Sequence, residues 1–256
     1  MTNETLPQAG VPARDTIVVV PCYNEAKRLD AAAVLHLVDT EPRVALLFVD
    51  DGSTDATARL LEDLSRSRPE SISYFSLAVN SGKTEAVRRG VLAALERRPA
   101  FVAYWDADLS TPLDMVPLFL AELDRNAHLL GVLGSRIRRL GADIDRLALR
   151  HYAGRIFATL ASAVLGMAVY DTQCGAKMFR ATDDVARAFS EPFQTRWILD
   201  VEMLARLRRD LGAEVLASRL FEMPLPRWRD VAGSKLTMAQ GAAAFVDLWR
   251  IWRTTR

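Results

Sequence analysis

Two aspartates, Asp106 and Asp108, stand directly after an apolar run at residues 101–105. The run is typical of a buried strand, and on extended backbone the side chains of residues i and i+2 point the same way. Both carboxylates can therefore converge beyond the end of the strand, where ligands bind in an open α/β sheet. Two converging carboxylates suit a hard divalent cation such as Mg²⁺ or Mn²⁺. An aspartate-rich turn has the same spacing, so the rest of the chain must decide between these readings.

Polar residues also follow three other apolar segments that have the character of strands. The segments are residues 16–20, 44–49 and 71–79, and the clusters after them are Pro21 to Glu25, Asp50 to Asp55 and Asn80 to Lys83. Helical patterns separate these strands, which indicates βαβ units and a parallel sheet. Because right-handed crossovers bring the carboxyl ends of parallel strands to one edge, we expect the four polar clusters to lie together.

The expected fold class is therefore α/β, a Rossmann-like, mostly parallel, doubly wound sheet with flanking helices. Residues 1–15 are polar and rich in Pro and Gly, which predicts a flexible N-terminus. Residues 16–236 have no clear linker and are expected to form one continuous domain. Residues 237–256 predict an amphipathic C-terminal helix.

Composition excludes several classes of protein. Half of the 256 residues are hydrophobic and a quarter are charged, which is ordinary for a globular domain. The formal net charge of +1 gives no reason to expect nucleic acid as a partner. The first 15 residues lack the apolar core of a signal peptide, and no apolar run reaches the roughly 20 residues of a spanning helix. Cys22 and Cys174 lie far apart, as in a reduced, cytoplasmic protein with two structural thiols.

Two common nucleotide-binding motifs do not match the chain. No G-x-G-x-x-G follows the first strand, so a dinucleotide fold is not indicated. Gly82, Lys83 and Thr84 look like the end of a P-loop, but Leu77 stands where the first glycine of that motif belongs. We therefore reject a nucleoside triphosphatase. Lys83 at a helix start can still meet a phosphate, or it can be a solvated lysine.

The C-terminal segment has two readings. Aromatic and apolar residues recur at helical spacing there, with arginines between them: Phe245, Leu248, Trp249 and Trp252, then Arg250, Arg253 and Arg256. Trp and Arg on an amphipathic helix fit a membrane interface. A helix docked on the domain with a solvated basic face fits the same pattern.

Taken together, these segments resemble the family 2 glycosyltransferases of the GT-A fold, over about residues 16–236. The matching pieces are VVPCYNE, FVDDGSTD, NSGKTEAVRRG, WDADLS, GSR, DTQCGAKMFR, DVEML and W-x-D-x-x-GSK. The branch that they resemble most acts on polyprenyl phosphates, as dolichyl-phosphate glucosyltransferases and dolichol-phosphate mannose synthases do. DTQCG followed by Lys177, then DVE and GSK, narrows the resemblance toward the glucosyltransferases.

The resemblance implies roles for individual residues. Contacts to the base and ribose fall to Pro21, Tyr23, Glu25 and the Asp50–Asp51 pair, metal binding to Asp106 and Asp108, and neutralisation of phosphates to Arg136 and Lys235. Arg150 or Arg155 resembles a further phosphate-binding residue. The mannose synthases have a glutamine that assists the metal where this chain has Ser110, so the third protein ligand stays open.

The implied activity is metal-dependent, inverting transfer of a hexose from a nucleoside diphosphate sugar to a polyprenyl phosphate. UDP-glucose is the favoured donor and GDP-mannose the alternative. The expected location is the cytoplasm, with contact to the inner face of the cell membrane. A small hydroxyl acceptor would instead need a general base, for which Asp200 and Glu202 are candidates, unless they form only the polar face of a helix. A sugar-nucleotide-binding subunit without turnover is the non-enzymatic alternative.

Overall fold

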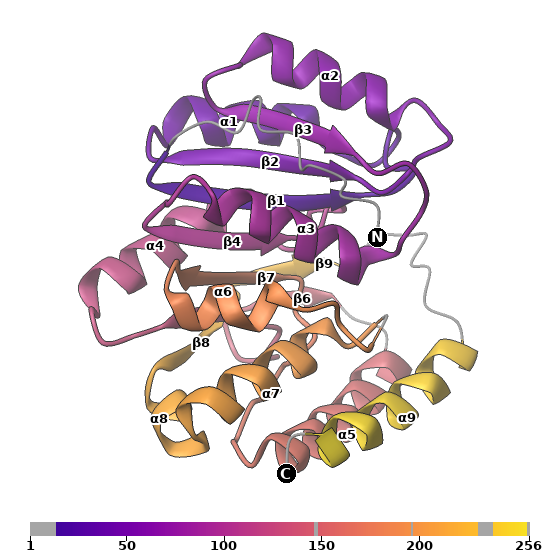
Figure 1. The fold of residues 1–256 in the computed structure, drawn as a ribbon, viewed down its shortest axis with the longest axis vertical. Helices are drawn as coiled ribbons and strands as arrows, with labels where there is room; N and C mark the ends of the chain where they lie inside the picture. Colours follow the sequence, from indigo (N-terminus) through magenta and orange to yellow (C-terminus); the bar gives the residue numbers. More distant parts are fainter. Residues whose placement is uncertain (1–13, 146–147, 196, 230–237, 255–256) are drawn as a thin grey trace. The chain divides into compact units, whose positions relative to one another are not determined.

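The computed structural model describes residues 14–145, 148–195, 197–229 and 238–254 (Figure 1). The chain divides into two compact units, Met1–Leu109 and Ser110–Arg256, and each is described by itself. No linker-like composition marks this boundary in the sequence, so it was not predicted. The division into residues 1–15, 16–236 and 237–256 remains a prediction.

The first unit is a parallel sheet with helices on both faces. Its strands are β1 (Thr16–Cys22), β2 (Val44–Asp50), β3 (Ile72–Ser76) and β4 (Phe101–Trp105), in the order β3-β2-β1-β4. All neighbouring pairs among them run parallel. Almost every residue of β1, β2 and β4 is buried, which explains why these strands are continuous apolar runs. The predicted α/β fold is confirmed.

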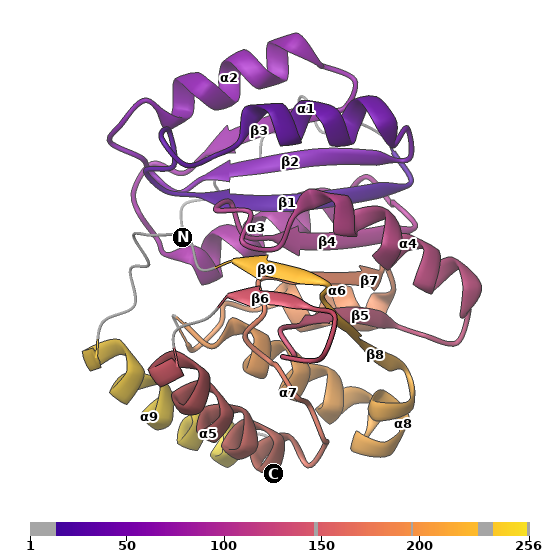
Figure 2. The same cartoon turned by 180° about the vertical axis from the view of Figure 1, so that it is seen from behind.

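Three helices connect these strands: α1 (Ala31–Thr40), α2 (Thr57–Ser67) and α3 (Lys83–Leu95). Helix α3 lies in front of the strands in Figure 1 and behind them in Figure 2, and α1 lies on the opposite face. Gly90 allows α3 to approach the sheet closely. A Cβ atom at this position would lie 2.3 Å from Val19 Cγ1 and 2.8 Å from Val49 Cγ2.

The second unit mixes strand directions. Strand β5 (Gly131–Ser135) pairs antiparallel with β7 (Ala176–Arg180) and parallel with β8 (Leu220–Pro224). Two short strands, β6 (Asp143–Asp145) and β9 (Arg227–Arg229), form a separate parallel pair. The helical segments are η1 (Leu113–Met115), α4 (Val116–Arg125), α5 (Ala148–Leu165), α6 (Asp183–Ser190), α7 (Leu199–Leu211), α8 (Ala213–Ser218) and α9 (Met238–Thr254).

Helices α5 and α9 lie side by side within this unit (Figures 1 and 2). Leu248 and Ile251 of α9 are buried, and the rings of Phe157 and Phe245 meet edge to face at 6.3 Å. Over the residues that the structure describes, neither these helices nor any other is long and apolar enough to cross a membrane.

Candidate active site

Asp106 and Asp108 follow the last residue of β4, as the sequence predicts. The Asp106 side chain is one-third exposed, and its Oδ1 atom lies 2.5 Å from Lys83 Nζ. Just after the two aspartates the chain turns sharply, because Leu109 N donates to Asp106 O and Leu109 adopts a φ of 50°. The Asp106 carboxylate therefore lies at the carboxyl edge of the sheet, beside Lys83, the first residue of α3.

Asp51 holds the loop that leads to Lys83. Its carboxylate accepts hydrogen bonds from Ser81 N at 2.7 Å and from Gly82 N at 2.8 Å. Burial raises the pKa of Asp51, although these two N–H groups act in the opposite direction. Both oxygens of the carboxylate thus bind backbone, which gives Asp51 a positioning role in addition to the contact with the base that the resemblance implies.

Asp50 is also buried and tied to its neighbours. Its Oδ1 accepts from Ser53 N and its Oδ2 from Ser76 Oγ, both at 3.1 Å. Asp50 therefore links the loop after β2 to the end of β3.

Pro21 and Tyr23 are partly exposed at the end of β1, whereas Glu25 is buried. The Glu25 carboxylate is bound by two nitrogens of Arg28, with Arg28 Nε 2.8 Å from Oε2. The hydrogen bond to Glu25 raises the pKa of Arg28, and the charge of Asp108 adds to this shift. Arg28 is thus a positively charged residue of the site that the motifs did not reveal. The spacing of three residues between Glu25 and Arg28 was the sequence feature that could have indicated this ion pair.

The structure brings the predicted residues of the first unit to one edge of its sheet. In the parallel register, Pro21 lies opposite Val49 and Cys22 opposite Asp50. Strand β4 pairs with the other side of β1, with Tyr104 opposite Val19. Continuing this register puts Asp106 level with Pro21. The edge carries both acidic groups that can hold a cation and basic groups that can meet a diphosphate.

In the second unit, Arg136 is committed to Asp171. The Asp171 carboxylate accepts from Arg136 N, from Nε at 2.6 Å and from Nη2 at 2.8 Å. Burial alone would raise the pKa of Asp171, but the charge and hydrogen bonds of Arg136 hold it well below its usual range. The Arg136 guanidinium also lies 5.2 Å from the ring centroid of Trp228, and the Arg136 side chain is only 12% exposed. In this structure Arg136 fastens the segment after Tyr170 to the end of β5.

Asp200 is paired with a fully buried lysine. Lys177 Nζ lies 2.6 Å from Asp200 Oδ1 and donates to Cys174 O at 2.6 Å. The Lys177 side chain is 0% exposed and Asp200 is nearly buried. The candidate base therefore belongs to a buried ion pair, which argues against a role in proton transfer.

Glu202, the other candidate base, supports a loop. Its carboxylate accepts from Gln194 N and Thr195 N at 3.0 Å and pairs with Arg206 at 2.8 Å. These contacts occupy both oxygens of a buried side chain, so the structure argues against Glu202 as a base. The i,i+4 spacing of Glu202 and Arg206 was a local signal for this ion pair, whereas the two backbone donors reach Glu202 only after the segment before α7 has folded.

Three basic residues were candidates for further phosphate contacts. Lys235 lies outside the described residues, and the side chain of Arg150 is likewise outside them. Arg155 donates to Tyr170 O at 3.0 Å and stacks 3.7 Å from the Tyr170 ring. Its guanidinium therefore ties α5 to the segment before Asp171.

Comparison with known protein families identifies the family to which this chain belongs. The sequence pattern of the family described as "Glycosyl transferase family 2" matches residues 17–184, about two-thirds of the chain. The chain belongs to glycosyltransferase family 2. It is accordingly an enzyme that transfers glycosyl groups, and the resemblance predicted from the motifs is confirmed.

Similar family 2 glycosyltransferases include two proteins named dolichyl-phosphate beta-glucosyltransferase. The one from Drosophila melanogaster is 31% identical, over 94% of this chain and 75% of the relative. The human one is 28% identical, over 91% of this chain and 74% of the relative. A solved structure of glucosyl-3-phosphoglycerate synthase from Mycobacterium tuberculosis, in complex with Mn²⁺ and UDP-glucose, matches with a TM-score of 0.68. At 21% identity, covering 94% of this chain and 79% of that one, it supports the fold alone.

The residues of this family 2 glycosyltransferase fit a divalent cation. Asp106 and Asp108 supply hard oxygen donors of the kind that Mg²⁺ and Mn²⁺ prefer. Among the described residues, no group of three or more His, Cys, Asp or Glu is placed to hold a metal. A cation bound to the D-x-D would therefore complete its shell with water and phosphate oxygens of the donor, as is usual for Mg²⁺.

Proposed function

We propose that this family 2 glycosyltransferase transfers glucose from UDP-glucose to a polyprenyl phosphate, with inversion and with Mg²⁺ or Mn²⁺ as cofactor. The observation that carries the proposal is the 31% identity to a dolichyl-phosphate beta-glucosyltransferase across 94% of the chain. The mycobacterial synthase, which shares the fold, was solved in complex with Mn²⁺ and UDP-glucose, and we propose the same donor and type of metal here. The two dolichyl-phosphate relatives are both named for glucose, so they lend no support to GDP-mannose.

The chain's own residues supply electrostatics rather than proton transfer. Departure of a nucleoside diphosphate builds negative charge, and a cation held by the D-x-D would stabilise that charge most in the transition state. Lys83 and Arg28 bring two further positive charges to the same edge of the sheet. A phosphate acceptor is already anionic at neutral pH, so it needs orientation and desolvation more than a base.

The commitment of Asp200 and Glu202 to buried partners supports a phosphate acceptor over a hydroxyl acceptor. A hydroxyl nucleophile needs a carboxylate that can take its proton. The Asp200 carboxylate is bound to Lys177, and that of Glu202 to Arg206 and two backbone N–H groups. The soluble enzyme with a small hydroxyl acceptor is therefore the weaker candidate.

A direct assay tests the function. Purified protein is incubated with Mn²⁺, polyprenyl phosphate in detergent, and radiolabelled UDP-glucose or GDP-mannose. We expect an anionic glucolipid from UDP-glucose, at a rate at least about tenfold above that with GDP-mannose, since a buried polar mismatch costs about 1–3 kcal/mol. Transfer to a small hydroxyl compound but not to the lipid would contradict the proposed acceptor. Binding of UDP-glucose without any transfer would favour the non-enzymatic subunit.

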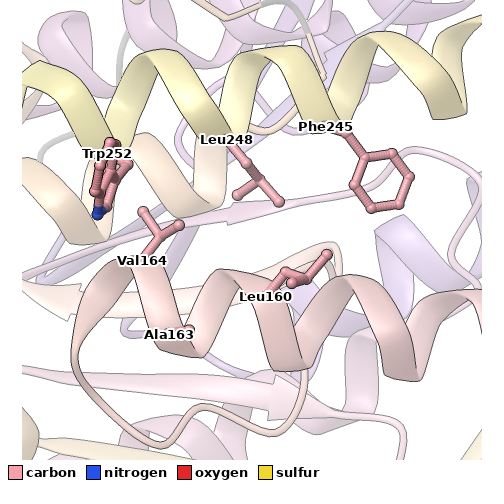
Figure 3. A pocket seen from close by; sticks show the side chains of 6 residues that line it. All are labelled: Leu160, Ala163, Val164, Phe245, Leu248 and Trp252. Carbon is pink, nitrogen blue, oxygen red and sulfur yellow. The ribbon is translucent and has the colours of Figure 1, made fainter.

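The proposal extends to location: cytoplasmic, and peripheral on the inner face of the cell membrane. Support comes from an apolar hollow of about 260 Å³ between α5 and α9. Figure 3 shows Phe245, Leu248 and Trp252 of α9 directed toward Leu160 and Val164 of α5. Several large apolar side chains of the two helices are exposed: Ile156, Leu160, Phe245, Val246, Trp249 and Trp252. We name these residues the α5–α9 face.

Arginines border the α5–α9 face. Arg250 and Arg253 are exposed, and the Arg253 guanidinium lies 4.9 Å from the Trp249 ring centroid. Each arginine near an anionic bilayer contributes about 1 kcal/mol of attraction, which salt screens. The helix is docked through Leu248 and still exposes aromatic surface, and this exposed surface supports the membrane contact that we propose.

Vesicle flotation tests this contact. We expect reversible binding to anionic liposomes at low salt, loss of binding at high salt, and about tenfold weaker partitioning of Trp249→Ser, because an indole leaves the interface. Val215→Ser, at an exposed valine on α8, is the matched control and should float as the parent does. Equal flotation of Trp249→Ser and the parent would exclude the α5–α9 face as the contact.

A further inference from the structure

Lys83 binds one of the carboxylate oxygens that a metal ion at the D-x-D would use. Its Nζ atom lies 2.5 Å from Asp106 Oδ1, and its side chain is 41% exposed. An ammonium and a divalent cation at the same carboxylate oxygen repel each other, so each weakens the binding of the other. Metal binding at Asp106 Oδ1 therefore favours departure of the Lys83 ammonium from this oxygen.

The backbone of Lys83 is fixed on both sides, so only its side chain can respond. Before it, Asp51 binds Ser81 N and Gly82 N. After it, α3 packs onto β1 and β2 through Gly90, where no Cβ would fit without displacement of Val19 or Val49. The Lys83 ammonium can move by rotation of its side chain, whereas the backbone at the start of α3 stays at the edge of the sheet.

A diphosphate offers the displaced ammonium a new partner. Lys83 stands at the N-terminus of α3, and a helix start with a lysine is a suitable place for phosphate oxygens. Without a nucleotide, a metal at Asp106 displaces the Lys83 ammonium from its ion pair and offers no phosphate oxygen in exchange. With a nucleotide, the metal and Lys83 can each bind phosphate oxygen.

We propose that Lys83 is the internal counter-ion of Asp106, so that the divalent cation binds together with the nucleotide diphosphate and only weakly without it. This inference rests on the proposed donor and metal, and it adds an order of binding that the reaction alone does not require. Asp51 acts in it as a positioning residue, through the loop that it holds.

The test measures Mn²⁺ binding to the nucleotide-free protein, from the electron paramagnetic resonance signal of the free ion. We expect Lys83→Met to bind Mn²⁺ about tenfold more tightly than the parent, since one positive charge near a dication is removed. Lys83→Arg keeps the charge and should bind as weakly as the parent. Lys27→Met removes the same charge from an exposed site in the same unit and should change nothing.

A second arm repeats the titration with saturating UDP. In the parent, UDP should raise Mn²⁺ affinity strongly, whereas in Lys83→Met this gain should shrink about tenfold or more, because the two ligands are linked thermodynamically. If Lys83→Met binds Mn²⁺ without UDP no better than the parent, the inference is overturned, while glucosyl transfer to the lipid remains to be judged by its own assay. Absence of Mn²⁺ binding in every variant, even with UDP, overturns both the inference and the metal assignment.

Discussion

Replacing Asp106 or Asp108 with asparagine should lower the rate of glycosyl transfer by about 10²-fold or more. Each substitution removes a charged oxygen ligand from a site where the leaving diphosphate gathers negative charge. The expected loss is in kcat more than in KM, because the stabilised charge develops in the transition state. Steady-state kinetics with UDP-glucose and polyprenyl phosphate give both parameters.

Controls separate this effect from damage to the fold. Asp106 lies at a partly exposed strand end, so both variants should unfold at the same temperature as the parent. Asp63→Asn, at an exposed aspartate of α2, should retain full activity. EDTA should abolish transfer and added Mn²⁺ or Mg²⁺ should restore it. Undiminished turnover in the chelator would remove the metal from the mechanism.

Lys177→Met should lower the free energy of unfolding by about 3–5 kcal/mol, the usual effect of breaking a buried ion pair. The substitution leaves Asp200 without its cation in a nearly buried position and leaves Cys174 O without its donor. Denaturant unfolding followed by circular dichroism measures the loss.

A double variant identifies the cause. Lys177→Met combined with Asp200→Leu removes both charges, and replacing a whole buried pair by apolar groups is often close to neutral. We expect this double variant to recover most of the lost stability. A Lys177→Met protein as stable as the parent would show that the pair is solvated in solution, and Asp200 would return as a candidate base.

Much of the first unit could be predicted because its signals are local. Strands β1, β2 and β4 are apolar throughout, and a parallel sheet with helices on both faces requires this pattern. The position of Asp106 at the end of β4 follows from the same rule. Strand β3 was expected over residues 71–79 but spans Ile72–Ser76, because its partner β2 ends at Asp50 and the bond from Leu77 N to Asp50 O is the last between them.

The second unit was harder to predict because its pairings are distant in sequence. Asp200 and Glu202 looked like available carboxylates, yet the partner of Asp200 is Lys177, in another element. The antiparallel direction of β7 depends on the path of the chain through α5, which no local pattern encodes. Helix α4 (Val116–Arg125) was not recognised either, although its buried face follows helical spacing. The helical periodicity of this segment was passed over because attention went to the neighbouring D-x-D.

The contact at Gly90 has a consequence for protein engineering. Since a side chain there would strike Val19 and Val49, the height of α3 above the sheet is set by the absence of a Cβ rather than by adjustable packing. The position from which the Lys83 side chain extends is thereby set by Gly90, which lies about two helical turns away in the core. Mutant libraries that aim to change donor or metal preference should therefore vary the loop residues around Ser81 and keep Gly90 unchanged.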